Sequence, residues 1–195
     1  IFFIVNFIIT NRQATHPIVH FHTLFSKKPF VGATMAISSH LTLLTGIAGI
    51  NVYIVRILKL PFDISLHFYF FFFVGVIITG ILKMFFYSSV GAGFLGTLGS
   101  SALLYVSIHW IILGNTINIP LLYIQGLLLG FGASMTLVSG SMATLLDGDL
   151  KEAAQRSQTM HTIRNFSAAM LIPIIAYTIK NHIQKGTQSI YARSE

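Results

Sequence analysis

Long apolar runs separated by short polar segments are the feature of this sequence that most limits its possible folds. A helix of about 20 apolar residues crosses the hydrocarbon core of a bilayer. Backbone polar groups in lipid must be satisfied within one segment, so continuous runs of this kind predict helices rather than the alternating strands of a membrane barrel. Residues 1–9 predict the end of a helix that starts before this chain. The complete predicted spans are 30–55, 66–82, 90–113, 121–146 and 157–179.

The composition excludes a soluble domain. Charged residues make up 9% of the 195-residue chain and apolar residues make up 54%, whereas a soluble protein is about 25% charged. A soluble chain of this size leaves much of its surface in water and could not bury so many apolar side chains. We therefore expect an all-α, multi-pass protein of the cell (inner) membrane. Ile1 stands inside an apolar run without the charged start of a signal peptide, which predicts truncation within a helix.

Basic residues are distributed between the ends of the predicted helices. Residues 10–29 are expected to form a cytoplasmic loop, and residues 180–195 form a polar tail. The net charge of +7 comes from scattered Lys and Arg without a basic stripe, so no nucleic-acid partner is expected. Helix parity puts Arg56 and Lys59 on one side, which the positive-inside pattern identifies as the outer side. The tail adds basic residues there, which reduces the contrast. The predicted cytoplasmic group is Arg12, Lys27, Lys28, Lys83, Lys151 and Arg156.

Arg164 is the most informative single residue, because it lies seven positions inside the predicted 157–179 span. A charge within a membrane is costly and normally faces a bundle interior or a wet cavity. His161 is one turn earlier on the same helix face. Together they predict a patch on a substrate or ion pathway, although snorkelling to headgroups or capping of a neighbouring helix would also explain Arg164. The weaker cavity candidates are His40, Asn51 and Gln125.

Two further patterns bear on mechanism. Gly126 and Gly130 form a GxxxG motif, which favours close helix packing; sliding of glycine-rich helices is the alternative. No Asp or Glu lies inside a complete predicted span. A proton-driven carrier would therefore need its main intramembrane carboxylate elsewhere.

A histidine cluster suggests a different class of protein. His16, His20 and His22 form H-x-x-x-H-x-H, and imidazole is a good ligand for zinc and iron. A membrane-bound His-metal enzyme would need several such clusters, and this one contains Pro17. The absence of cysteine excludes a thiolate metal site. We expect no bound metal, no cofactor and no catalytic residue, with the metal enzyme kept as an alternative.

Two segments resemble the fourteen-helix drug:proton antiporters of the major facilitator superfamily. One segment begins at Gln125-Gly126, passes Gly130 and Gly132, and ends with Gln155-Arg156 and residues 162–169. It is similar to the family's penultimate pair of helices. The Gly80-Ile81-Leu82 run is at best a remnant of the superfamily loop signature, with Met84 where an Asp is expected. The other segment resembles a recurring loop of the family and comprises His16-Pro17-Ile18-Val19, Leu24-Phe25, Lys27-Lys28 and Phe30. His20 stands where the family usually has an acid.

This resemblance implies part of the C-terminal half of such a carrier, from the end of helix eight through helix thirteen. It implies proton-coupled efflux of drug-like or amphipathic small molecules by alternating access. The implied partners are a small-molecule substrate, protons, the lipid bilayer and the missing N-terminal half of the carrier. The helix starting at Val90 would be peripheral, and the other complete spans would line the central cavity. A non-transporting membrane scaffold, associated through its GxxxG faces, remains the other alternative.

Overall fold

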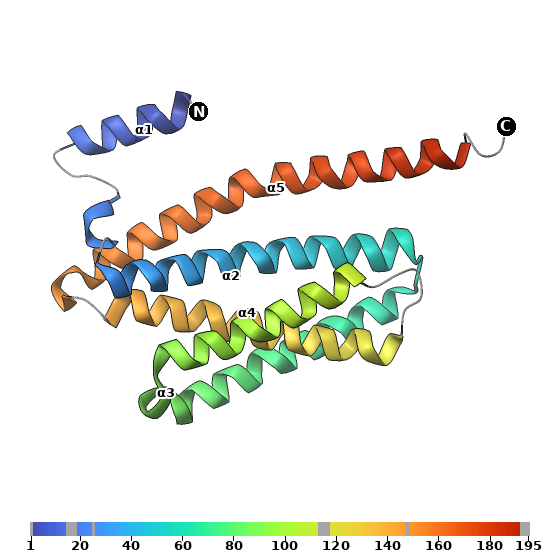
Figure 1. Ribbon diagram of the computed structural model, residues 1–195, viewed down its shortest axis with the longest axis horizontal. Helices are drawn as coiled ribbons and strands as arrows, with labels where there is room; N and C mark the ends of the chain where they lie inside the picture. Colours follow the sequence, from blue (N-terminus) through green and yellow to red (C-terminus); the bar gives the residue numbers. More distant parts are fainter. Residues whose placement is uncertain (1, 15–18, 25, 113–117, 147–148, 192–195) are drawn as a thin grey trace.

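The computed structural model describes the chain except residues 1, 15–18, 25, 113–117, 147–148 and 192–195, and it confirms an all-α fold. Four segments are long and apolar enough to cross a membrane: 27–57, 62–112, 119–146 and 150–182. These lengths and compositions are those of a membrane protein. The α-helices are α1 (Phe2–Gln13), α2 (Lys27–Val52), α3 (Phe62–Ile112), α4 (Ile119–Leu146) and α5 (Ala153–Tyr191) (Figure 1).

Helix α3 is 51 residues long and reverses direction at Gly91, which has φ 78° and ψ 167°. Only glycine adopts such a conformation readily. The reversal divides α3 into a first limb (62–90) and a second limb (92–112), which fold back on each other (Figure 1). The turn expected over residues 83–89 is instead helical. That stretch contains neither Gly nor Pro, so the helix continues until Gly91 allows the chain to turn.

The other element ends differ from the expected boundaries more modestly. The predicted 10–29 loop contains the end of α1, a 3-10 turn at Phe21–Leu24 and the first turn of α2. A π-helical turn, Tyr53–Ile57, extends α2 before the chain reaches Pro61. Helix α5 continues to Tyr191, well past the expected end of its span at residue 179.

Helix α4 is the centre of the bundle, and glycine residues place its backbone against its neighbours. Half of the apolar stretch of α4 is buried, compared with 22% of the apolar stretch in residues 27–57 and 6% of that in residues 150–182. At four glycines of α4, an added Cβ atom would clash with the backbone of a facing helix. The tight packing predicted from the GxxxG motif is therefore confirmed. The facing pairs are Gly126 with Phe68, Gly130 with Phe72, Gly132 with Gly99, and Gly140 with Gly32.

The apolar core is small, and many large apolar side chains point outward. Phe85, Ile111 and Tyr177 are among those exposed, as suits contact with lipid rather than with water. The core lies where α2 and both limbs of α3 meet α4. Its buried members are Ile50, Ile54, Phe68, Phe72, Leu103, Leu122, Leu129 and Ala133.

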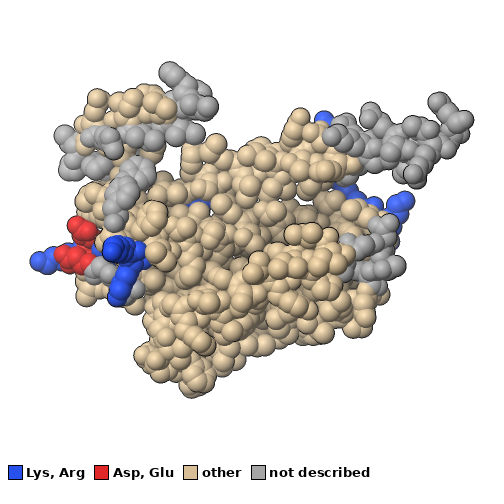
Figure 2. All heavy atoms as spheres, in the orientation of Figure 1, with Lys and Arg blue, Asp and Glu red and all other residues tan. Residues whose placement is uncertain are grey.

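Charged side chains gather at the two ends of the bundle, and the middle of the face in Figure 2 is almost free of them. Lys27, Lys28 and Lys151 lie at the end where α2 begins and α4 ends, whereas Arg56 and Lys59 lie at the opposite end. Lys83 does not belong to a loop, contrary to expectation. It lies in the first limb of α3, and its Nζ donates to Met135 O of α4 at 2.9 Å and to Ser134 O at 3.4 Å.

Candidate functional site

A groove separates α2 from the second limb of α3, because both pack on α4 rather than closely on each other. It consists of three adjoining cavities of about 240, 590 and 220 Å³. The first two share Thr42 and Ser107 in their walls. The second and third share Gly49 and Trp110. The cavities therefore form one continuous groove along the part of the bundle that would lie within a membrane.

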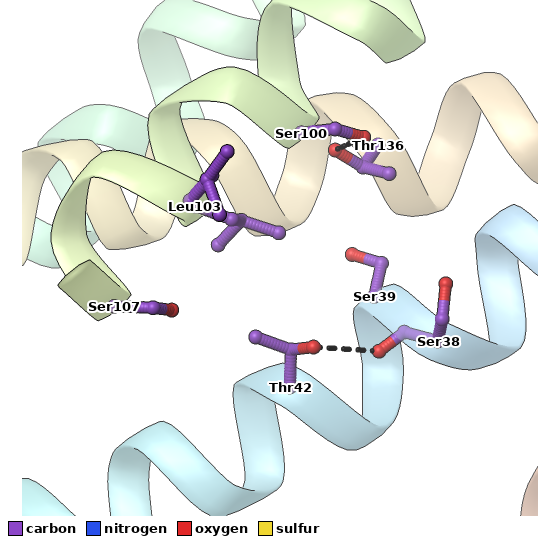
Figure 3. Close-up of a pocket in the computed structure, with 8 residues that line it drawn as sticks. Ser38, Ser39, Thr42, Ser100, Leu103, Ser107 and Thr136 are labelled. Carbon is purple, nitrogen blue, oxygen red and sulfur yellow. Dashed lines mark hydrogen bonds between the residues drawn. The ribbon is translucent and has the colours of Figure 1, made fainter.

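One end of this groove is lined by hydroxyl groups from three helices (Figure 3). Thr42 Oγ1 donates to Ser38 O at 2.9 Å, and Ser39 Oγ donates to Ala133 O at 3.1 Å. Each hydroxyl has one proton to donate and two lone pairs to accept with. A hydroxyl that already donates its hydrogen bond to a backbone carbonyl can only accept a hydrogen bond from a ligand. The contributing residues are Ser38, Ser39, Thr42, Ser100, Ser107 and Thr136.

The other end of the groove is apolar and aromatic. Its walls include Gly46, Gly49, Trp110, Leu129 and Leu171, with Tyr53 in the adjoining cavity. An added Cβ atom at Gly49 would meet nothing within 4 Å. This glycine therefore leaves open space beside α2 rather than allowing a close helix contact.

Gln125, a predicted cavity residue, lies behind the groove wall. Its side chain is 1% exposed. Trp110 Nε1 donates to Gln125 Oε1 at 2.7 Å, and Gln125 Nε2 lies 2.7 Å from His109 Nδ1. Gln125 is not among the residues that line the three cavities. In this arrangement it fixes the orientation of Trp110, which does line the groove.

Asn51, the second weaker candidate, also lies outside the lining of the groove. Its Oδ1 accepts a hydrogen bond from the hydroxyl of Tyr69 at 2.8 Å. This contact ties the end of α2 to the first limb of α3.

The remaining three predicted residues come together between α2 and α5. Figure 1 shows these helices running in the same direction from the end that carries Lys27 and Lys151. Ala36 packs in one cluster with Met160, so one turn further along each helix places His40 beside Arg164. His161 lies three residues before Arg164 on α5, on the same side of the helix. These three side chains form the cationic cluster.

The groove and the cationic cluster occupy opposite faces of α2. Successive residues of an α-helix are rotated by about 100°. Ser38, which lines the groove, and His40, which belongs to the cluster, are therefore about 200° apart. The two candidate sites share helices α2 and α5, since Leu171 of α5 lines the groove, but they share no lining residue.

Arg156 is the buried charge that sequence reasoning missed. It is 1% exposed, and its Nε and Nη2 donate to Thr144 O at 2.9 Å and Leu145 O at 2.8 Å. Glu152 lies 3.9 Å from its Nη1. The last carbonyls of a helix have no partners within it, so Arg156 caps the end of α4. The capping role considered for Arg164 belongs to the arginine two turns earlier, whose position just after an apolar helix was the available signal.

His20 and His22 of the predicted histidine cluster lie in a segment just before α2, and hydrogen bonds hold this segment in place. Asn11 Nδ2 donates to Val19 O at 2.8 Å, and Asn11 Oδ1 accepts from Val19 N at 3.0 Å. The backbone N–H of His20 donates to Thr159 Oγ1 at 3.0 Å. The rings of His20 and His22 are 6.1 Å apart. His16 lies outside the described residues, and within them no three metal-ligating side chains come together.

Comparison with protein-family models, with curated proteins and with solved structures finds no match to this chain. The function must therefore be argued from its own residues and from the geometry of the groove and the cationic cluster.

Proposed function

We propose that this chain is part of a membrane carrier that exports drug-like or amphipathic small molecules by alternating access, with protons as the coupling ion. The groove between α2 and the second limb of α3 carries this proposal. The resemblance to the fourteen-helix antiporters gives the same class, but it places the helix that starts at Val90 at the periphery, whereas this proposal places that helix in the wall of the groove. Carriers of that architecture hold their substrates between two halves near the middle of the bilayer. In this proposal a second half supplies the opposite wall and the coupling carboxylate.

The two ends of the groove suit an amphipathic substrate. Hydroxyl lone pairs at the Ser38 end would accept hydrogen bonds from an ammonium, amide or hydroxyl group. The larger cavity of about 590 Å³, beside Trp110 and Leu129, is of the size that holds a drug-like apolar body. This arrangement favours molecules with hydrogen-bond donors at one end and an apolar body at the other.

The topology follows from the helix directions. In this proposal α2, the two limbs of α3, α4 and α5 cross the membrane in turn. The end with Lys27, Lys28 and Lys151 faces the cytoplasm by the positive-inside rule. Arg164, His161 and His40 lie on the face of α2 away from the groove, so this proposal assigns them to an ion pathway and not to the substrate groove.

The test uses two glycines at different places in the fold, each with open space for an added side chain. An added Cβ atom meets nothing within 4 Å at Gly49, in the groove, or at Gly80, on the exposed side of α3. Gly49→Leu should fill the groove without disturbing the fold, and Gly80→Leu is its matched control. Trp110 is the sole tryptophan, and it lines the groove. Quenching of its emission by rhodamine 6G therefore reports binding to the purified protein.

We expect saturable quenching in the wild type and in Gly80→Leu, and a loss of saturable quenching in Gly49→Leu. Cells that express the full-length carrier should show the same order in rhodamine 6G efflux. Unchanged quenching and efflux in Gly49→Leu would refute the groove as a substrate site. That outcome would favour the scaffold alternative, for which the glycine-mediated backbone contacts around α4 are the supporting observation.

A further inference from the structure

We propose that the cationic cluster of His40, His161 and Arg164 is a binding site for an anionic group that carries at least two oxygen atoms. A carboxylate or the phosphodiester of an anionic lipid has the required chemistry. The site lies on the opposite face of α2 from the groove. The proposal therefore does not depend on the proposed transport function.

The charge balance around Arg164 favours an external anion. The sequence contains five acidic residues: Asp63, Asp147, Asp149, Glu152 and Glu195. Asp63 and Glu152 lie in the first turns of the apolar segments 62–112 and 150–182, and no acidic residue lies deeper in a described apolar segment. Glu152, in the 3-10 turn just before α5, has its Oε2 3.9 Å from Nη1 of Arg156. A guanidinium at membrane depth normally has a counter-ion, and none of the acidic side chains that the structure describes forms an ion pair with Arg164.

The hydrogen bonding of Arg164 is incomplete. Arg164 Nε is buried and has no hydrogen-bond partner among the described residues. Arg156 on the same helix shows the contrast, because its guanidinium donates to two carbonyls. The acceptors that Arg164 lacks would come from a ligand, and a planar guanidinium fork matches two oxygens of one anion.

The cluster is accessible to a ligand. His161 is exposed, and Arg164 and His40 are half-buried. An anion can therefore approach from the outer surface of α5 without passing through the packed core. Arg164 lies eight residues beyond Arg156, which is about 12 Å along the helix. A free organic acid or the headgroup of an anionic lipid could supply the same chemistry at this depth.

The experiment uses the full chain in phosphatidylcholine nanodiscs and has two arms that distinguish these sources. In the first arm, benzoate and its uncharged analogue benzamide are titrated by calorimetry. In the second arm, native mass spectrometry measures retention of phosphatidylglycerol from mixed nanodiscs. We expect benzoate to bind in preference to benzamide, or phosphatidylglycerol to be retained in preference to phosphatidylcholine. Either result supports the site and identifies the source.

The variants test whether Arg164 carries the preference. Arg164→Gln should weaken anion binding about 30-fold or more, which is the usual effect of removing one partner of a buried charge pair. Arg56→Gln is the matched control at an exposed position at the far end of α2 and should leave binding unchanged. If Arg164→Gln does not fold, Arg164→Lys decides, because it keeps the charge but loses the planar fork and should weaken binding severalfold. Absence of an anion preference in both arms, or a preference unchanged by these variants, would overturn the proposal.

Discussion

Replacing Gly130 by Ala is the sharpest test of the idea that α4 holds the bundle together through backbone contact. An added Cβ atom at Gly130 would clash with the carbonyl of Phe72 in the first limb of α3. The clash is with backbone, so a rotamer change in a flexible side chain cannot relieve it. The two helices would have to move apart along the interface that Phe68 and Phe72 occupy.

The cost of this separation can be worked out from the packing. A buried side chain makes roughly 40–60 contacts of about 0.1–0.2 kcal/mol each, and a gap of 0.5–1 Å loses about a quarter of that energy or more. Two buried phenylalanines would thus lose about 4 kcal/mol together. The higher helix propensity of Ala returns about 1 kcal/mol. We expect a net destabilisation of about 3 kcal/mol, or a decrease of about 6–12 °C in Tm for a chain of this length.

Thermal unfolding of the purified protein, followed by circular dichroism in a nonionic detergent, measures this effect. Two further glycines calibrate it. At Gly46 an added Cβ atom would lie 3.5 Å from Trp110, an ordinary contact, and at Gly80 it would meet nothing within 4 Å. The expected order of Tm is Gly80→Ala at or above the wild type, then Gly46→Ala, then Gly130→Ala. A Tm for Gly130→Ala equal to or above that of Gly80→Ala would refute the backbone-contact reasoning.

Two other contacts yield predictions at the basic end of the bundle. Arg156→Gln should cost about 3 kcal/mol or more, because two charge-assisted hydrogen bonds to the end of α4 are lost, and thermal unfolding beside the exposed Arg56→Gln variant measures this loss. Equal Tm values for these two variants would contradict the capping role. Asn11→Ala should release the segment that begins at Val19, since both hydrogen bonds between these residues disappear. Amide hydrogen exchange over residues 19–24 should then accelerate about 10-fold or more, while unchanged exchange would show that other contacts hold the segment.

The helical architecture was predictable because the apolar runs are long and continuous. The position of the turn within α3 was not, because its signal is local geometry rather than polarity. Residues 83–89 include Lys83 and two serines, which suggested a loop, but none of them stops a helix. Gly91 stops it through a positive φ that polarity does not reveal.

The groove illustrates a second limit of sequence reasoning. Thr42 donates to its own helix, which is what an isolated Thr in a membrane helix commonly does and is weak evidence for a cavity. Its importance comes from the meeting of Ser38, Ser100 and Thr136 around the same space. Three separate helices contribute these residues, and their spacing along the chain does not indicate that they converge. By contrast, His161 and Arg164 lie on one helix, so helical periodicity predicted their neighbourhood directly.

The position of α2 between the two candidate sites limits how they can influence each other. Gly32 holds the start of α2 against α4, and the contact between Asn51 and Tyr69 holds its end against α3. A helix held at both ends moves little. A substitution on one face should therefore change ligand binding on the other face by no more than about 0.5 kcal/mol, or roughly twofold in affinity. Gly49→Leu should therefore leave benzoate binding at Arg164 unchanged within that range, as calorimetry can measure. A larger change would show that α2 shifts as a rigid body, and the groove and the cationic cluster would then be coupled parts of one transport cycle.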